Sequence, residues 1–106
     1  MESKTAVWPD ISDQPLTLAR ADRFIILDVR TIQEFVGDHL QNAVHIPYDE
    51  IQVNIQKIRD WGKPIITYSD NGRRSKIAAA TLSMMGVKAI DGGSLTKVKS
   101  LFGQEF

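Results

Sequence analysis

Residues 64–85 constrain the fold of this chain more than any other stretch. They begin with a short apolar run at residues 64–68 and continue through a polar segment at residues 69–75. A helical pattern follows, with apolar or small residues at Ile77, Ala78, Thr81, Leu82 and Met85. This order predicts a strand, a tight loop and a helix in direct succession. Such a loop gathers backbone N–H groups at the start of a helix, which favours an anion there.

Three further segments indicate strands. Residues 24–29 form an apolar run interrupted only by Asp28, which is typical of a strand buried on both faces of a parallel sheet. Residues 42–47 indicate a shorter strand, closed by a proline, and residues 87–90 indicate a last one. The Asp-Gly-Gly sequence at residues 91–93 then predicts a turn.

Helical patterns alternate with these strands. Thr31 and Glu34 have the spacing of a capping box, which predicts a short helix that ends at Gly37. One apolar helical face is formed by Ile51, Ile55, Ile58 and Trp61. Gly86 ends the helix that follows the loop, and residues 94–102 form a last helix capped by its serine. The alternation predicts an α/β fold, with a mostly parallel central sheet and helices on both faces.

Length and composition bound the function classes. The 106 residues fit a single domain over residues 1–106. Because 13 basic residues balance 13 acidic ones, the total charge does not favour a nucleic-acid partner. No apolar run reaches the ~18 residues of a membrane-spanning helix. The absence of cysteine excludes disulfides, thiolate metal sites and a thiol nucleophile, and we expect neither a metal nor a cofactor.

The first residues carry weaker signals. Residues 6–8 indicate a short edge strand, and residues 15–21 indicate one or two helical turns. No apolar signal-peptide core follows the charged N-terminus, so the chain as written predicts a cytoplasmic protein. A chain from which a signal peptide had been removed would look the same, which leaves a periplasmic location open.

Polar residues follow two of the predicted strands, at the ends where parallel sheets bind ligands. Asp28 and Arg30 close one strand and Ser69 closes another, so we expect them at the same edge of the sheet. The helix after Ser69 begins with basic residues, which oppose the helix dipole unless an anion compensates them. The candidate anion ligands are Asp70, Asn71, Gly72, Arg73, Arg74 and Ser75. Alternatively, the arginines face solvent or pair with Asp28, Glu34 or Asp70.

Ser69 occupies the place at the strand end where such a loop would hold a nucleophile. A serine hydroxyl needs an adjacent base to react, and the sequence offers only His39 and His45, neither tied to Ser69 by spacing. Glycines do not flank Ser69 as they do in a nucleophile elbow. A serine hydrolase or phosphatase is therefore the weakest alternative, and a hydroxyl that bonds its own loop is the simpler interpretation.

Three motifs together resemble the single-domain rhodaneses, which are thiosulfate sulfurtransferases. The first is LDVR at residues 27–30 with EF at residues 34–35 and GDHLQNAVHIP at residues 37–47. The second is YSDNGRRS at residues 68–75, similar to Y-C-x-x-G-x-x-S. The third is MGV at residues 85–87 with DGG at residues 91–93. The motifs cover about residues 24–100, and the small size and lysine-rich end are most similar to rhodaneses of the phage-shock-protein-E type.

The resemblance implies a persulfide mechanism. In the family, a loop cysteine takes the outer sulfur of thiosulfate and passes it to cyanide or a biological thiol. Ser69 falls on that cysteine, residues 70–75 fall on the anion cradle, and Asp28 and Arg30, with Glu34, fall on a supporting layer of ion pairs. The implied partners are a small anionic sulfur donor and a thiol or cyanide acceptor, without nucleic acid or membrane.

Ser69 is the difference from the family motif that bears on activity, because a serine cannot form the persulfide. Two hypotheses stay open: a sulfurtransferase whose nucleophile has been replaced, or a naturally non-catalytic rhodanese module that binds a partner or a small anion. Both predict that the chain as written transfers no sulfur.

Overall fold

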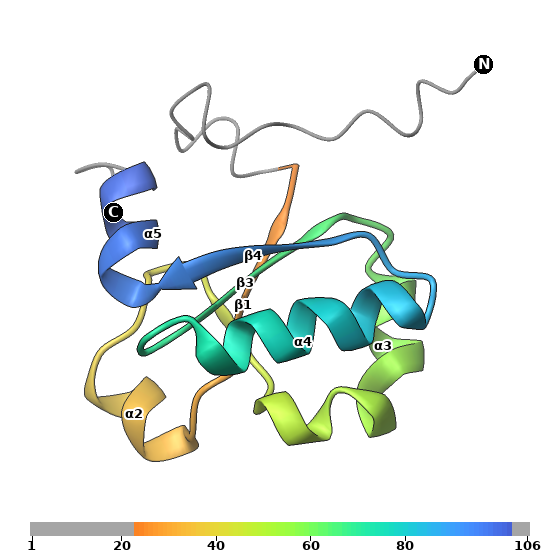
Figure 1. The fold of residues 1–106 in the computed structure, drawn as a ribbon, viewed down its shortest axis with the longest axis horizontal. Coiled ribbons are helices and arrows are strands. Elements are labelled where there is room, and N and C mark those ends of the chain that lie inside the picture. Colours follow the sequence, from red (N-terminus) through yellow and green to blue (C-terminus); the bar gives the residue numbers. More distant parts are fainter. Residues whose placement is uncertain (1–22, 103–106) are drawn as a thin grey trace.

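Four parallel strands form the centre of the molecule (Figure 1). A computed structural model describes residues 23–102. The strands are β1 (Ile25–Asp28), β2 (Val44–His45), β3 (Ile65–Ser69) and β4 (Ala89–Ser94), in the order β2-β1-β3-β4. The central pair, β1 and β3, is aligned so that Ile25 lies opposite Ile65 and Asp28 opposite Tyr68. The predicted α/β fold with a parallel sheet is confirmed.

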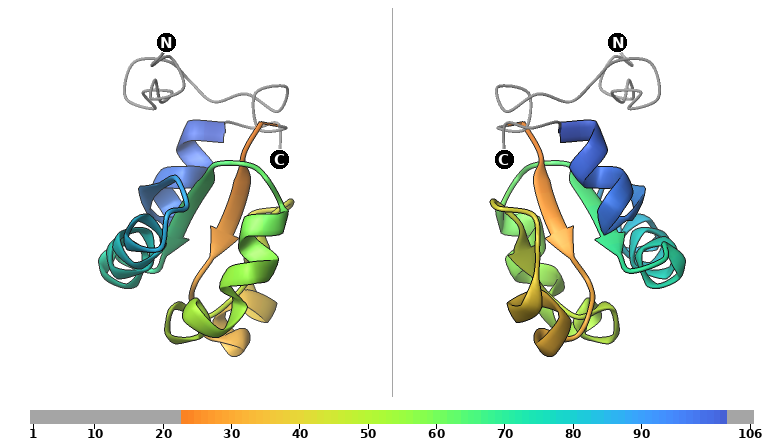
Figure 2. Two further views of the ribbon diagram at one scale, coloured as in Figure 1. Left: turned by 90° about the vertical axis from the view of Figure 1, so that its right-hand side faces the viewer. Right: turned by 90° about the vertical axis from the view of Figure 1, so that its left-hand side faces the viewer.

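Helices cover both faces of the sheet. They are α3 (Ile55–Asp60), α4 (Arg73–Met84) and α5 (Leu95–Phe102). A further helix, α2 (Ile32–Gly37), has no buried residue. One buried cluster joins Leu27 and Ile65 of the sheet to α3 and α4. A second cluster joins Ile26 and Ile66, on the opposite face, to Val98 of α5. Figure 2 shows this arrangement in two opposed views, with α3 in front of the sheet in one and α5 in front in the other.

The continuous apolar runs of β1 and β3 explain this two-sided core. Successive side chains of a strand point to opposite faces, so a strand covered on both faces needs an apolar residue at nearly every position. Leu27, Ile65 and Ile66 have no exposed surface and Ile26 is 3% exposed. Burying each such side chain stabilises the folded protein by about 1.5–3 kcal/mol.

Two predicted elements are shorter or more broken than expected. The strand predicted at residues 42–47 is only Val44–His45, because Ala43 closes a turn onto Leu40 and Pro47 cannot continue the ladder. The helix predicted around residues 51–61 is divided into a 3₁₀ turn, η2 (Gln52–Asn54), and α3, and a separate 3₁₀ turn, η1 (Tyr48–Glu50), precedes it. Its apolar face is confirmed, since Ile51 and Ile58 are buried in the first cluster and Ile55 and Trp61 pack against it.

The turn predicted at residues 91–93 is wrong, because these residues belong to β4. This position of the strand is occupied by a glycine, Gly92, because there is no space for a side chain there. A Cβ atom at Gly92 would lie 2.8 Å from the carbonyl oxygen of Thr67 and 3.0 Å from Val98. The close approach of β3, β4 and α5 thus requires this glycine.

The expectations for residues 6–8 and 15–21 lie outside the described residues. Within residues 23–102, no helix has the length and hydrophobicity needed to cross a membrane.

Candidate functional site

The loop after β3 lies at the carboxyl edge of the sheet, beside the end of β1. Ser69 is the last residue of β3, and α4 begins at Arg73 after Gly72, whose φ is +89°. The backbone N–H of Val29 donates to the carbonyl of Tyr68 at 3.1 Å, so the two strand ends are adjacent. The predicted meeting of these two strand ends at one edge is confirmed.

The Ser69 hydroxyl is completely buried and fully hydrogen-bonded. Its oxygen accepts the backbone N–H of Gly72 at 3.0 Å and that of Ser75 at 3.1 Å. Its proton points to the hydroxyl oxygen of Ser75 at 3.2 Å. Ser69 therefore bonds its own loop, and two N–H groups converge on the atom that would be the sulfur of a cysteine.

Asp91 completes this arrangement, and the sequence reasoning missed it. The Ser75 hydroxyl donates to Oδ1 of Asp91 at 2.6 Å, and the same oxygen accepts the N–H of Gly93 at 2.9 Å. Asp91 lies in β4, the strand next to β3. The available signal was an acidic residue placed directly after the apolar start of a strand that ends at the same edge.

The rest of the loop faces outward. Asp70, Asn71 and Arg73 are exposed, and the Asn71 side chain accepts the backbone N–H of Arg73 at 3.0 Å. The backbone N–H groups of Asn71 and Arg74 bond to no acceptor within residues 23–102. Free N–H groups at the first turn of a helix attract anions.

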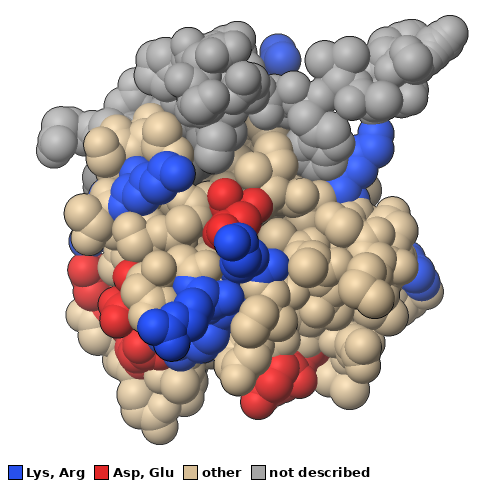
Figure 3. Space-filling model, in the orientation of Figure 1, with Lys and Arg blue, Asp and Glu red and all other residues tan. Residues whose placement is uncertain are grey.

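Arg74 is paired inside the protein, as the alternative to anion binding predicted. Its guanidinium donates to both carboxylate oxygens of Glu34, at 2.9 and 3.0 Å. This contact, together with the N–H of Thr31, lowers the pKa of Glu34 to about 2. Arg73 and Lys76 remain exposed on the same helix start. Basic and acidic side chains accordingly lie side by side over α2 and the beginning of α4 on the face seen in Figure 3.

Asp28 and Arg30 form a buried ion pair behind the loop. Nε of Arg30 lies 3.0 Å from Oδ1 of Asp28 and Nη2 lies 2.7 Å from Oδ2, and the guanidinium also bonds the carbonyl of Asp38. It lies 5.6 Å from the ring centroid of Tyr68. Burial, with the neighbouring Asp28, raises the pKa of Tyr68. The pair therefore supports the residue next to Ser69 without bonding Ser69 itself.

The two histidines bond elsewhere. His39 Nδ1 lies 2.7 Å from the carbonyl oxygen of Phe35, and His45 Nε2 lies 2.7 Å from that of Arg30. Both rings stack on Phe35. Among the described residues, the hydrogen-bond partners of the Ser69 hydroxyl are Gly72 and Ser75. Residues 23–102 also contain no group of three acidic or histidine side chains placed to hold a metal ion.

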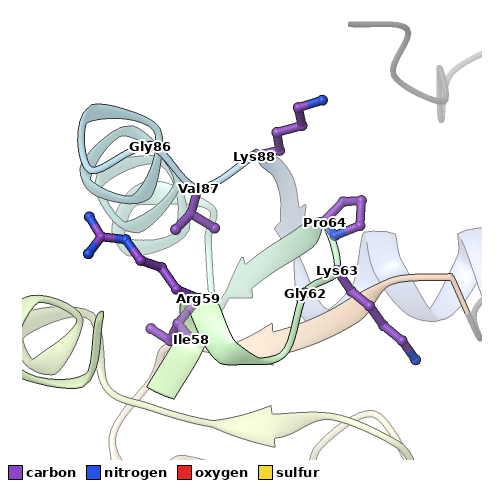
Figure 4. Close-up of a pocket in the computed structure, with 8 residues that line it drawn as sticks. All are labelled: Ile58, Arg59, Gly62, Lys63, Pro64, Gly86, Val87 and Lys88. Atoms are coloured by element: carbon purple, nitrogen blue, oxygen red, sulfur yellow. The ribbon is translucent and has the colours of Figure 1, made fainter. Parts of the chain in front are cut away.

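One cavity of about 340 Å³ lies away from this loop (Figure 4). It is lined by residues before β3 and β4, including Arg59, Pro64 and Val87. Lys63 and Lys88 belong to its rim, but Figure 4 shows their side chains directed away from Val87. The cavity is therefore at the amino end of the strands, opposite Ser69.

Comparison with known proteins agrees with the fold. The chain matches the model of the rhodanese-like domain over residues 13–96. It is 35% identical over 65 residues to the putative sulfur carrier protein YrkF of Bacillus subtilis, covering 61% of this chain and 35% of that protein. It is 35% identical over 72 residues to the thiosulfate sulfurtransferase GlpE of Pseudomonas savastanoi pv. phaseolicola, covering 65% and 67%.

A solved structure described as a rhodanese with anions from E. coli aligns with a TM-score of 0.64 and 29% identity, over 70% of this chain and 89% of that one. The chain spans only about a third of the length of YrkF. Since the family model matches well over half of the sequence, the chain belongs to the family of rhodanese-like domains.

Proposed function

We propose that this protein is a rhodanese-like module that binds a small sulfur oxyanion at residues 70–75 and transfers no sulfur from position 69. The observation that carries the proposal is the Ser69 oxygen, which accepts the N–H groups of Gly72 and Ser75 at 3.0 and 3.1 Å. These two N–H groups are placed to bind the sulfur of a nucleophile, and in this protein they bind the Ser69 hydroxyl.

A hydroxyl changes the chemistry at this position. A cysteine at a helix start is readily ionised, and its thiolate attacks the outer sulfur of thiosulfate, forming a persulfide as sulfite leaves. A serine hydroxyl stays protonated without a base, and here the Ser69 hydroxyl donates a hydrogen bond to the Ser75 hydroxyl, which is no base. No cysteine elsewhere in the sequence can take its place.

The anion site itself does not need the sulfur. The open N–H groups of Asn71 and Arg74, the start of α4 and the exposed Arg73 offer donors and positive charge at one place. The names of two relatives, a thiosulfate sulfurtransferase and a putative sulfur carrier protein, support a sulfur compound as the ligand class. If position 69 carried a cysteine, thiosulfate would be the donor and a thiol or cyanide the acceptor.

Thiocyanate formation from thiosulfate and cyanide tests the proposal, measured for this chain and for Ser69→Cys. We expect no turnover with Ser69 and turnover with Ser69→Cys. Turnover by the unchanged chain would overturn the proposed mechanism. A folded but inactive Ser69→Cys variant would favour a pure binding module over a dormant sulfurtransferase.

Anion binding is measured separately by thermal melts with sulfate and thiosulfate. We expect both anions to raise the melting temperature, and Arg73→Ala to reduce this effect. Lys57→Ala, which removes an exposed charge on α3, serves as the control. A melting temperature that neither anion changes would refute the anion site.

A further inference from the structure

The Ser75 hydroxyl has one proton and three possible acceptors. They are Oδ1 of Asp91 at 2.6 Å, the carbonyl of Gly72 at 3.1 Å and the carbonyl of Gly93 at 3.3 Å. A hydroxyl bound to a carboxylate has an O···O distance of about 2.5–2.7 Å, and such bonds are roughly twice as strong as neutral ones. The proton therefore lies on the side of Asp91.

This choice fixes the protonation of the side chain at position 69. With its proton directed to Asp91, Ser75 can offer only a lone pair to Ser69, at 3.2 Å. The Ser69 oxygen already accepts the N–H groups of Gly72 and Ser75. The lone pair that Ser75 directs to residue 69 receives a donor only when residue 69 carries a proton.

We infer that Asp91 is a positioning residue that, through Ser75, keeps a proton donor at position 69 and disfavours additional negative charge in the loop. The inference rests on the proposed function and deepens it. A carboxylate one hydroxyl away from position 69 repels an anion there, and it repels a dianion more than a monoanion.

Asp91 differs from the other charged groups around the loop in its direct hydrogen bond to Ser75. Arg74 is matched by the carboxylate of Glu34. Asp70, Arg73 and Lys76 are exposed, so solvent screens their effect on the buried position 69, while Arg73 can still contact an anion at the surface of the loop. Lys97 of α5 lies beside Gly93, with Nζ 3.9 Å from the position of a Cβ atom built there. Asp91 is the charged group that bonds directly to the Ser75–Ser69 chain.

The absence of cysteine makes a direct test possible, because Ser69→Cys would create the sole thiol in the protein. The rate of alkylation by iodoacetamide is measured against pH for Ser69→Cys and for Ser69→Cys with Asp91→Asn. Asparagine keeps an acceptor oxygen for Ser75 and Gly93 while it removes the charge. We expect the midpoint of the profile to fall by about one pH unit in the double variant.

The control is Ser69→Cys with Asp60→Asn, which removes a carboxylate from α3. We expect its midpoint to match that of Ser69→Cys. Asp91→Ala in the same background provides a second measurement if the asparagine variant does not fold. Equal midpoints with and without the Asp91 carboxylate would overturn the inference.

A second arm uses the natural Ser69 and measures the binding of sulfate. We expect Asp91→Asn to tighten sulfate binding about three- to tenfold, and to change the binding of the monoanion nitrate less. A chain that binds neither anion, with or without Asp91, would refute the proposed function, while the thiol profile would still decide the role of Asp91. Tightening that is equal for both anions would overturn the preference against dianions.

Discussion

Glu34 accepts both hydrogen bonds of the Arg74 guanidinium, at 2.9 and 3.0 Å, and it also accepts the backbone N–H of Thr31 at 2.9 Å. One carboxylate thus closes the capping box of α2 and anchors the first turn of α4. The contact explains how a helix can begin with arginines against its dipole. It also leaves Arg73, rather than Arg74, as the arginine available to a ligand.

Glu34→Gln is expected to lower the free energy of unfolding by about 1 kcal/mol at neutral pH, because it weakens both the cap and a partly exposed ion pair. The pKa of Glu34 is lowered from 4.5 to about 2, so its charge favours the folded state. This contribution is complete above the unfolded pKa and is lost as the pH falls through about 2. Urea unfolding across the acid range measures it.

Glu50→Gln is the control, since Glu50 is an exposed acid on η1. The two variants should differ at neutral pH and converge at the acid end of the range. A constant difference between them down to the lowest pH would show that the ionised carboxylate of Glu34 contributes nothing.

Gly92→Ala is expected to destabilise the fold by about 1–3 kcal/mol through overpacking. The new methyl group would meet the Thr67 carbonyl oxygen at 2.8 Å, and backbone atoms cannot rotate away. Gly37→Ala is the matched control, because nothing lies within 4 Å of a Cβ atom there and Gly37 is helical. Alanine suits a helix better than glycine. Chemical denaturation of both variants should therefore give changes of opposite sign, and a harmless Gly92→Ala would contradict the close approach of β4 to β3.

Arg30→Met is expected to cost about 3–5 kcal/mol, because it leaves the carboxylate of Asp28 buried without its partner. The double variant Asp28→Asn with Arg30→Met should be much less destabilised than the sum of the single variants. Unfolding in urea measures this cycle. For comparison, Lys99→Met breaks the exposed pair with Asp38, and we expect little or no loss from it. Additive costs at residues 28 and 30 would contradict a coupled buried pair.

The parallel sheet and the strand, loop and helix of residues 64–85 could be predicted from sequence because their signals are local. The apolar runs at residues 24–29 and 64–68 reflect burial on both faces, and this requirement leaves few alternatives to a parallel strand. The pairing of Arg74 with Glu34 was one of the alternatives that the charges at the helix start allowed. To choose this alternative, one must know that Arg74 and Glu34, 40 positions apart in the sequence, are in contact, and the structure shows this.

Asp91 could not be found in this way. An Asp-Gly-Gly sequence predicts a turn when glycine is taken as a residue of unusual φ. Gly92 instead serves close packing against Thr67 and Val98, a contact between three elements that no local pattern records. Similarly, the spacing of Ile51 and Ile58 predicted the buried face correctly, but 3₁₀ turns and α-helix place apolar residues at similar intervals. The periodicity of apolar residues predicts which side chains are buried more reliably than it predicts whether the backbone is an α-helix or a 3₁₀ turn.

Tyr68→Phe is expected to lower the free energy of unfolding by about 1–3 kcal/mol. The Tyr68 side chain is fully buried, and its hydroxyl oxygen accepts the backbone N–H of Leu40 at 3.0 Å. Phenylalanine has the same shape without this acceptor, so the N–H would be buried without a partner. Tyr48→Phe is the control, because Tyr48 is 38% exposed and water can replace any bond of its hydroxyl. Equal losses from the two variants, measured by chemical denaturation, would show that the Tyr68 hydroxyl does not anchor the segment at Leu40 to the strand that ends in Ser69.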